Sequence, residues 1–213
     1  MVDLPTVLVL WGALVALSLV LLLRDLRRNN PEIHGLMKAV WVLTVAYSGP
    51  LGLAGFYWSG RKQIPRDDLW RRAFRSVAHC YSGCGLGEIV GLTVTVGLLG
   101  LSTVWVTAVT FACAYVMGFA LTIGPLMQGG EPFAEALRDT LWSETASIAV
   151  MEIVAIGVDL ALAGSAGPAS ALFWASLAVS LTCGLAAAYP VNVLLIRFGI
   201  KEGMHSPKAH AAH

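Results

Sequence analysis

The sequence predicts an all-α protein, a polytopic transmembrane helical bundle of about six helices. Only 13% of its 213 residues are charged, 57% are hydrophobic, and the mean hydropathy is +0.72. Four stretches carry no formal charge and span 20, 22, 42 and 37 residues, at 4–23, 39–60, 89–130 and 160–196. A helix needs about 20 apolar residues to cross a hydrocarbon core of roughly 30 Å, so each of the two longest stretches holds more than one crossing. No alternating pattern typical of a membrane barrel occurs.

The first apolar stretch, 5–23, predicts a retained membrane helix rather than a cleaved signal peptide. It lacks a basic segment before it, and Arg24, Arg27 and Arg28 follow where a small-residue cleavage site would be expected. The predicted domains are an N-terminal helix with its basic stop-transfer segment at 1–30, a helical bundle domain at 31–204, and a flexible polar tail at 205–213.

The second helix, predicted over 37–58, contains the sequence Ser48-Gly49-Pro50 near its middle. It is long enough to cross the membrane with a kink at the proline, which is the commoner outcome. The alternative is a re-entrant segment broken at the same place. Irregular backbone at that depth is tolerated only where it is buried in protein or lines a wet cavity. We expect the kinked crossing, and therefore six spans.

Four further crossing helices are predicted, at 78–100, 103–126, 141–163 and 169–197. The charged segment 61–75 predicts a short amphipathic interfacial helix after Pro65, with Trp70 and Phe74 as apolar anchors. Segment 131–140 indicates a second short interfacial helix.

The charge distribution favours a multi-pass protein of the cell membrane with a cytoplasmic C-terminus. The formal net charge is +1, which gives no basic field that would attract nucleic acid. With six spans, the 14 basic residues divide ten to four, and the richer side holds both termini. With a re-entrant second segment, all 14 fall on one side. Both arrangements put His79 and Cys80 at the cytoplasmic side.

The segment from His79 to Glu88 carries the most distinctive chemistry of the chain. Cys80 and Cys84 are four residues apart and share one face of a helix, and Glu88 lies a further turn along. Thiolates and an imidazole suit soft or borderline ions such as Cu(I) and Zn(II). Each residue alone is more typical of ordinary packing, because cysteine behaves as a small buried hydrophobe. Ionisable residues inside a membrane helix indicate a functional site.

The fifth predicted helix adds carboxylates, Glu144, Glu152 and Asp159, with Met151 beside Glu152. A carboxylate in mid-helix should face the bundle interior or a wet cavity, and it often marks an ion path. The alternative is a protonated structural carboxyl bonded to a neighbouring helix. The predicted metal ligands are His79, Cys80, Cys84, Glu88, Met151 and Glu152.

Gly83, Gly87 and Gly91 form a ridge of small residues on the same helix. Such spacing lets another helix approach closely, which places this helix in the centre of the bundle. The ridge is also where a second copy of the chain, or another membrane protein, could dock.

Several separated motifs carry a resemblance that runs roughly over residues 38–204. They are Trp41, Ala46-Tyr47-Ser48-Gly49-Pro50-Leu51-Gly52, His79-Cys80 with Gly83-Cys84 and Gly87-Glu88, Asp139-Thr140-Leu141, Ala188-Tyr189-Pro190-Val191-Asn192, and Ile200-Lys201-Glu202-Gly203-Met204. With these motifs the chain resembles an uncharacterised polytopic membrane family catalogued as domain of unknown function 4396. Glu88 stands where we expect aspartate more often in that family, which preserves the carboxylate. The resemblance implies a fold and no activity, and a similarity to copper-handling proteins is analogy.

These features predict an integral membrane protein that binds and translocates a soft or transition metal ion, copper first and zinc second. Its expected partners are the lipid bilayer and the ion. No nucleophile elbow, phosphate loop or dinucleotide fingerprint occurs, which disfavours an enzyme. One alternative is a membrane thiol-redox protein, although Cys80 and Cys84 on one helix would have α-carbons about 6 Å apart, near the upper part of the disulfide range. Another is a non-catalytic assembly subunit.

Overall fold

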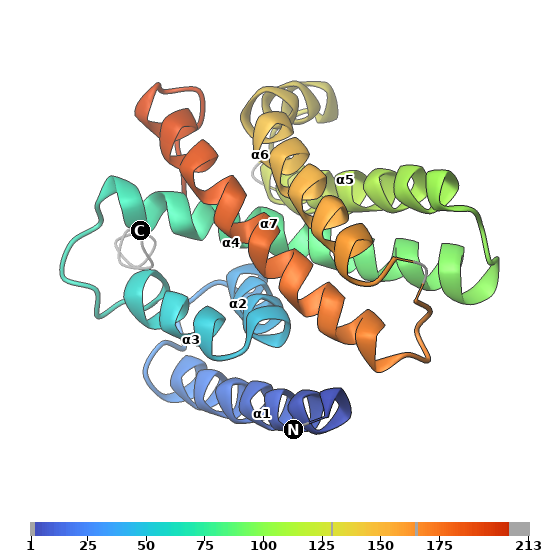
Figure 1. Cartoon of the computed structure of the whole chain (residues 1–213). Coiled ribbons are helices and arrows are strands. Elements are labelled where there is room, and N and C mark those ends of the chain that lie inside the picture. Colours follow the sequence, from blue (N-terminus) through green and yellow to red (C-terminus); the bar gives the residue numbers. More distant parts are fainter. Residues whose placement is uncertain (1–2, 129, 165, 205–213) are drawn as a thin grey trace. The chain divides into compact units, whose positions relative to one another are not determined.

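The computed structural model describes residues 3–128, 130–164 and 166–204, and every regular element in these ranges is helical (Figure 1). The elements are α1 (Leu4–Arg28), α2 (Gly35–Ser48), α3 (Pro50–Gly55), the π-helical turn η1 (Phe56–Gly60), α4 (Leu69–Leu92), the π-helical turn η2 (Thr93–Leu98), α5 (Thr103–Gln128), α6 (Phe133–Leu162) and α7 (Ala171–Arg197). The chain forms two compact units. Unit 1 holds the residues up to Ala78 and from Asn192 onward, and unit 2 holds His79–Val191.

Five helices are long and apolar enough to cross a membrane, counted over the described residues. They are α1, α4 together with η2, α5, α6 and α7. The all-α prediction is confirmed, and the composition and helix lengths are those of a helical membrane bundle. The predicted flexible tail at 205–213 lies outside the described residues.

The segment predicted as the second crossing is broken at Gly49. This glycine has φ +54° and ψ −126°, a backbone conformation that glycine adopts readily because it has no β-carbon. Pro50 then begins α3. A β-carbon on Gly49 would also lie 3.0 Å from a methyl group of Val15 on α1. Helix α2 has 14 residues, a length of about 21 Å, which is too short for a hydrocarbon core of roughly 30 Å.

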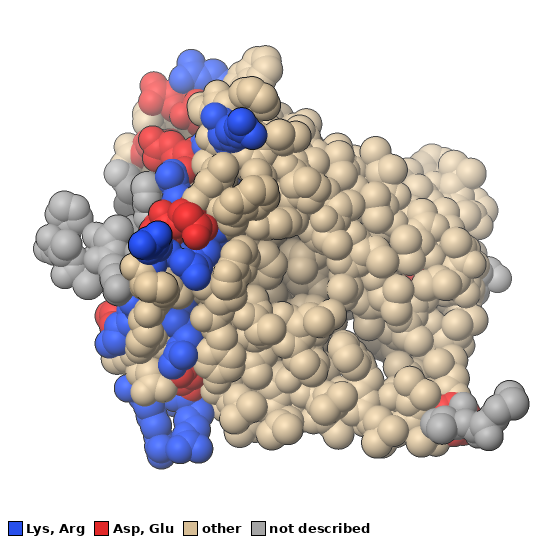
Figure 2. All heavy atoms as spheres, turned by 60° about the vertical axis from the view of Figure 1, so that its left-hand side comes forward, with Lys and Arg blue, Asp and Glu red and all other residues tan. Residues whose placement is uncertain are grey.

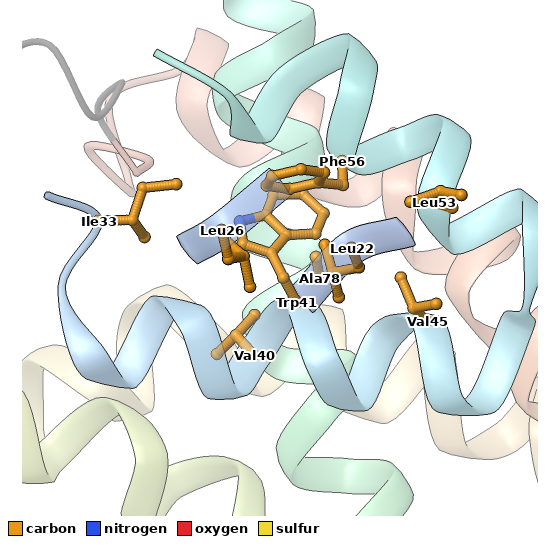
Figure 3. Packing of buried hydrophobic residues seen from close by; sticks show 9 residues of the cluster. All are labelled: Leu22, Leu26, Ile33, Val40, Trp41, Val45, Leu53, Phe56 and Ala78. Atoms are coloured by element: carbon orange, nitrogen blue, oxygen red, sulfur yellow. The ribbon is translucent and has the colours of Figure 1, made fainter. Parts of the chain in front are cut away.

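After the break the chain folds back along α2 as a helical hairpin. The ring of Trp41 on α2 packs edge-on against Phe56 with centroids 5.4 Å apart, and a β-carbon on Gly60 would lie 2.5 Å from the Trp41 ring. Figure 3 shows Trp41 and Val45 pointing toward the returning helical segment that carries Leu53 and Phe56. The core of unit 1 comprises Leu22, Leu26, Ile33, Val40, Trp41, Val45, Leu53, Phe56 and Ala78.

The two ends of the hairpin are joined at one end of unit 1 by a buried carboxylate. Asp25, near the end of α1, accepts two hydrogen bonds from Arg61, at 2.9 and 3.1 Å, and one from Asn30 at 2.8 Å. Asn30 in turn accepts the backbone N–H of Lys62 at 2.8 Å. The loop that precedes the hairpin therefore meets the loop that follows it. The second predicted segment is therefore folded back as a re-entrant hairpin. The prediction of a kinked crossing there, and so of six crossings, is wrong.

A second buried charge fixes the start of α4 in unit 1. The guanidinium of Arg75 is 1% exposed, and it donates to the carbonyls of Ser59 at 2.7 Å and Met204 at 2.8 Å, and to the Asp67 carboxylate. It thus ties the end of the hairpin and the segment after α7 to one helix. Complete pairing of this kind is what makes a buried charge tolerable.

The basic side chains of unit 1 gather where these loops meet. They come from the end of α1, from the loop after it, from the segment after η1 and from the first turns of α4. Figure 2 shows lysine and arginine side chains concentrated on the left-hand side of that view. This is the distribution expected if the second segment is folded back.

The two predicted interfacial helices are not separate elements. Residues 61–68 are not helical, and Trp70 and Phe74 belong to the first turns of α4. Segment 131–140 is likewise continuous with the following crossing, since α6 starts at Phe133 and runs to Leu162. Pro132 caps α6, and no helix-breaking residue separates its polar first turns from its apolar part.

The hairpin predicts the labelling pattern of single cysteines in membrane vesicles. Glu32→Cys and Gln63→Cys, both at exposed positions, should react with a membrane-impermeant maleimide from the same side, because the two loops are in contact. Asp3→Cys, at the other end of α1, should react from the opposite side. Labelling of residues 32 and 63 from opposite sides would contradict the hairpin.

Candidate functional site

The glycine ridge of α4 brings this helix against α5 at backbone contact. A β-carbon on Gly83 would lie 2.8 Å from the α-carbon of Gly118, and one on Gly91 would lie 2.7 Å from that of Thr110. A β-carbon on Gly87 would overlap Ala114. The paired positions rise along α4 and fall along α5 in steps of four, so the two helices run antiparallel with one face of each in contact.

The ridge therefore packs within the chain, as the prediction of a central helix requires. Docking of a second copy or another membrane protein at Gly83, Gly87 and Gly91 stays a prediction, and it would require α5 to be displaced.

A polar stripe on α4 lies one residue away from the ridge. Helix α4 is continuous from Leu69 to Leu92, so Cys80, Cys84 and Glu88 share one face as their spacing predicts. Each of these three side chains is 1% exposed or less. The stripe faces α6, whose buried polar residues include Glu144 and Glu152.

The first contact of the stripe is a thiol–carboxylate pair. The thiol of Cys80 donates to Oε2 of Glu144 at 2.7 Å, and the Glu144 residue is 4% exposed. The bond joins α4 to α6 between side chains 64 positions apart in the chain. A hydrogen bond to a carboxyl group is among the stronger ones that a buried thiol can make.

The second contact surrounds Cys84, where three helices meet. A β-carbon on Gly118 of α5 would lie 3.2 Å from the Cys84 sulfur and 3.1 Å from the Cδ1 of Ile148 on α6. Glu152 lies close enough to the Cys84 thiol to interact with it electrostatically. Both carboxylate oxygens of Glu152 are buried and have no hydrogen-bond partner at normal distance in the described part of the chain.

Glu88 extends the stripe toward the end of α6. Its carboxylate is within electrostatic range of Glu152 and Asp159, and its Oε2 has no hydrogen-bond partner among the described residues. Asp159 is held differently, because the Ser176 hydroxyl on α7 donates to its Oδ1 at 2.6 Å. Two of these three carboxylates are thus buried with unsatisfied oxygens, a costly state in an apolar bundle.

We call this set the thiol–carboxylate row. It comprises Cys80, Glu144, Cys84, Glu152 and Glu88.

The other two predicted ligands lie outside the row. Met151 is fully buried, and its side chain packs against Gly184 of α7, where a β-carbon would lie 3.2 Å from the Met151 Cγ. His79 is 5% exposed and is the first residue of unit 2. Over the described ranges, no three His, Cys, Asp or Glu side chains converge closely enough to hold a metal ion. The row is therefore a line of donors and not a preformed cage.

Sequence reasoning missed the partner of Cys80. The predicted helix begins at 141, which puts Glu144 in its first turn, and Glu144 is not among the predicted ligands. Helix α6 begins at Phe133, so Glu144 is about three turns inside it. The detectable signal was weak: Glu144 lies eight residues before Glu152, within about 80° on the helix circumference.

Removing the Cys80 thiol tests its hydrogen bond to Glu144. Cys80→Ala should lower the free energy of unfolding by about 1–3 kcal/mol, because a buried carboxyl oxygen loses its donor. Cys80→Ser should recover part of that loss, and Cys113→Ala, at a half-buried free cysteine, is the matched control. The measurement is thermal unfolding of the purified protein in detergent. Equal midpoints for the two alanine variants would show that the bond does not stabilise the fold.

Filling the ridge tests whether α4 depends on α5. Gly87→Val should destabilise the protein by about 1–3 kcal/mol or more, because the added carbons overlap backbone. Gly124→Val on α5, where a β-carbon meets nothing within 4 Å, is the control and should unfold close to the wild type. An unchanged unfolding midpoint for Gly87→Val would contradict the close approach.

Comparison with known proteins gives one family and no further relative. No curated protein matches the chain, and no solved structure matches it. The family model described as "Domain of unknown function (DUF4396)" matches residues 69–201, which include α4 to α7 and the whole thiol–carboxylate row. This match spans more than half of the chain, so the protein belongs to the DUF4396 family.

Proposed function

We propose that this protein binds a cation and moves it across the cell membrane along the thiol–carboxylate row, with a soft transition-metal ion, copper first, as the cargo. The supporting observation is the burial of Glu88 and Glu152 within helices long and apolar enough to cross a bilayer. Carboxylates at such positions are expensive and typically serve an ion or proton path.

The charge balance of unit 2 supports a cation as the cargo. Residues 79–191 contain seven carboxylates, and their one basic side chain of the Lys or Arg type is Arg138. Arg138 is exposed and pairs with Asp139 at 3.4 Å, so it does not neutralise the row. The buried carboxylates must then be protonated or paired with an ion that enters the bundle.

The thiols support a soft ion over a hard one. Neither Cys80 nor Cys84 forms a disulfide, and the two thiols alternate along the row with carboxylates. Thiolate ligands select Cu(I) and Zn(II) over magnesium or calcium. A line of partial sites also suits a cargo better than a resident cofactor, since a transported ion must bind weakly enough at each point to leave.

The charge pattern supports an orientation with the loops of unit 1 and the C-terminus in the cytoplasm. With the second segment folded back, all 14 lysines and arginines belong to one side, which is the cytoplasmic side by the positive-inside rule. Cys80 is then nearer to the cytoplasm than Cys84, and Glu88 lies farther along α4 from the cytoplasm than both thiols.

Copper loading of the purified protein tests the proposal. At equilibrium with Cu(I) under reducing conditions the wild type should bind the ion, and the double variant Cys80→Ser/Cys84→Ser should not. The matched control is Cys113→Ser/Cys183→Ser, which removes the other two free thiols and should retain the ion. Metal content per chain is the readout. Unchanged copper stoichiometry and affinity in the first double variant would contradict the proposal.

Substituting the carboxylates tests transport separately from binding. In vesicles that contain the protein, Glu88→Gln and Glu152→Gln should abolish copper flux while Cys80 and Cys84 still bind the ion. Flux at the wild-type rate in both variants would remove the carboxylates from the path. A Cys80–Cys84 disulfide that forms readily under mild oxidation would instead favour the thiol-redox alternative.

A further inference from the structure

The C-terminal end of α1 carries an apolar pocket that has three arginines among its lining residues. Its volume is about 370 Å³, and its lining residues are Val20, Leu23, Arg24, Arg27 and Arg28. Their spacing of three and four residues places them along a single face of the last turns of α1. Val20 is 61% exposed and Leu23 38% exposed, so the apolar wall is open to its surroundings.

The three arginines bring positive charge that the protein does not neutralise. No ion pair or hydrogen bond joins the guanidinium groups of Arg24, Arg27 and Arg28 to other described residues. The nearest acid in sequence, Asp25, is buried and already accepts from Arg61 and Asn30. The pocket surface itself is apolar, so the arginines line it with their aliphatic stems. Their exposed guanidinium groups are available to phosphate oxygens, which a planar guanidinium binds in pairs.

The position of the pocket along α1 corresponds to the level of the lipid headgroups in a bilayer. The apolar stretch from Leu4 to Leu23 has 20 residues, which as a helix spans about 30 Å, the thickness of the hydrocarbon core. Arg24 is the first residue beyond it, so the arginines begin at the headgroup layer. Val20 and Leu23 lie within the last turn below, at the level of the acyl chains.

We propose that this pocket binds an anionic phospholipid, with the phosphate on Arg24, Arg27 and Arg28 and an acyl chain along Val20 and Leu23. Charge complementarity selects an anionic over a zwitterionic lipid. The apolar wall selects a lipid over a soluble phosphate ester, which would leave that wall uncovered. The site lies in unit 1 and does not depend on the thiol–carboxylate row.

Native mass spectrometry of the full chain in detergent, titrated with phosphatidylglycerol or phosphatidylcholine, measures this binding. The wild type should retain phosphatidylglycerol in preference to phosphatidylcholine. Each arginine near a membrane surface contributes about fivefold in affinity, so the triple variant Arg24→Gln/Arg27→Gln/Arg28→Gln should bind about 100-fold more weakly. The triple variant Arg66→Gln/Arg138→Gln/Arg197→Gln removes the same charge from exposed positions elsewhere and should bind as the wild type does.

A second variant keeps the test decisive if the triple variant folds poorly. Val20→Glu introduces a carboxylate at an exposed pocket position, leaves all three arginines in place, and should also lower phosphatidylglycerol binding. Equal losses in the pocket and control variants, or no loss in the pocket variants, would overturn the proposal. Displacement of the lipid by glycerol phosphate at equal concentration would assign the pocket to a soluble phosphate ester instead.

Discussion

The contact on which unit 2 depends is the approach of α4 to α5 at van der Waals distance between backbones. In a bilayer the hydrophobic effect does not drive helices together, because lipid is as apolar as their side chains, and close packing supplies the attraction instead. Gly87 has no room for even a methyl group beside Ala114. Because the ridge is only one residue away from Cys84 in register, the same contact that fixes α4 also aims its polar stripe at α6.

The helical class and the long helices could be predicted from the sequence, because lipid demands long apolar runs. The Gly-Pro pair marks where the second segment is interrupted, although a kinked crossing is the expected outcome there. The direction of the chain after the break could not be predicted. It depends on Trp41 meeting Phe56 and on Asp25 meeting Arg61, which are contacts between residues 15 and 36 positions apart. Helical periodicity describes neighbours on one helix and contains no information on such pairs.

In the candidate site, too, the arrangement along one helix could be predicted and the contacts between helices could not. The shared face of Cys80, Cys84 and Glu88 follows from a period of 3.6 residues, and the structure has it. That Glu152 would lie opposite Cys84, that Met151 would turn to Gly184, and that Glu144 would take the Cys80 thiol all depend on where α6 begins and how it is rotated. A single sequence does not encode that rotation in any local pattern.

The burial of α4 has a consequence for how the protein is made. Of the five long helices, α4 is the least apolar and has the largest share of buried residues in its apolar window. As it leaves the ribosome it has no partner for Cys80, Cys84 or Glu88, since α5 and α6 are not yet synthesised. A helix of this kind partitions poorly into lipid alone. The glycine ridge lets α4 pair with α5 as soon as α5 is made, whereas the polar stripe on the neighbouring face of α4 is covered only when α6 follows.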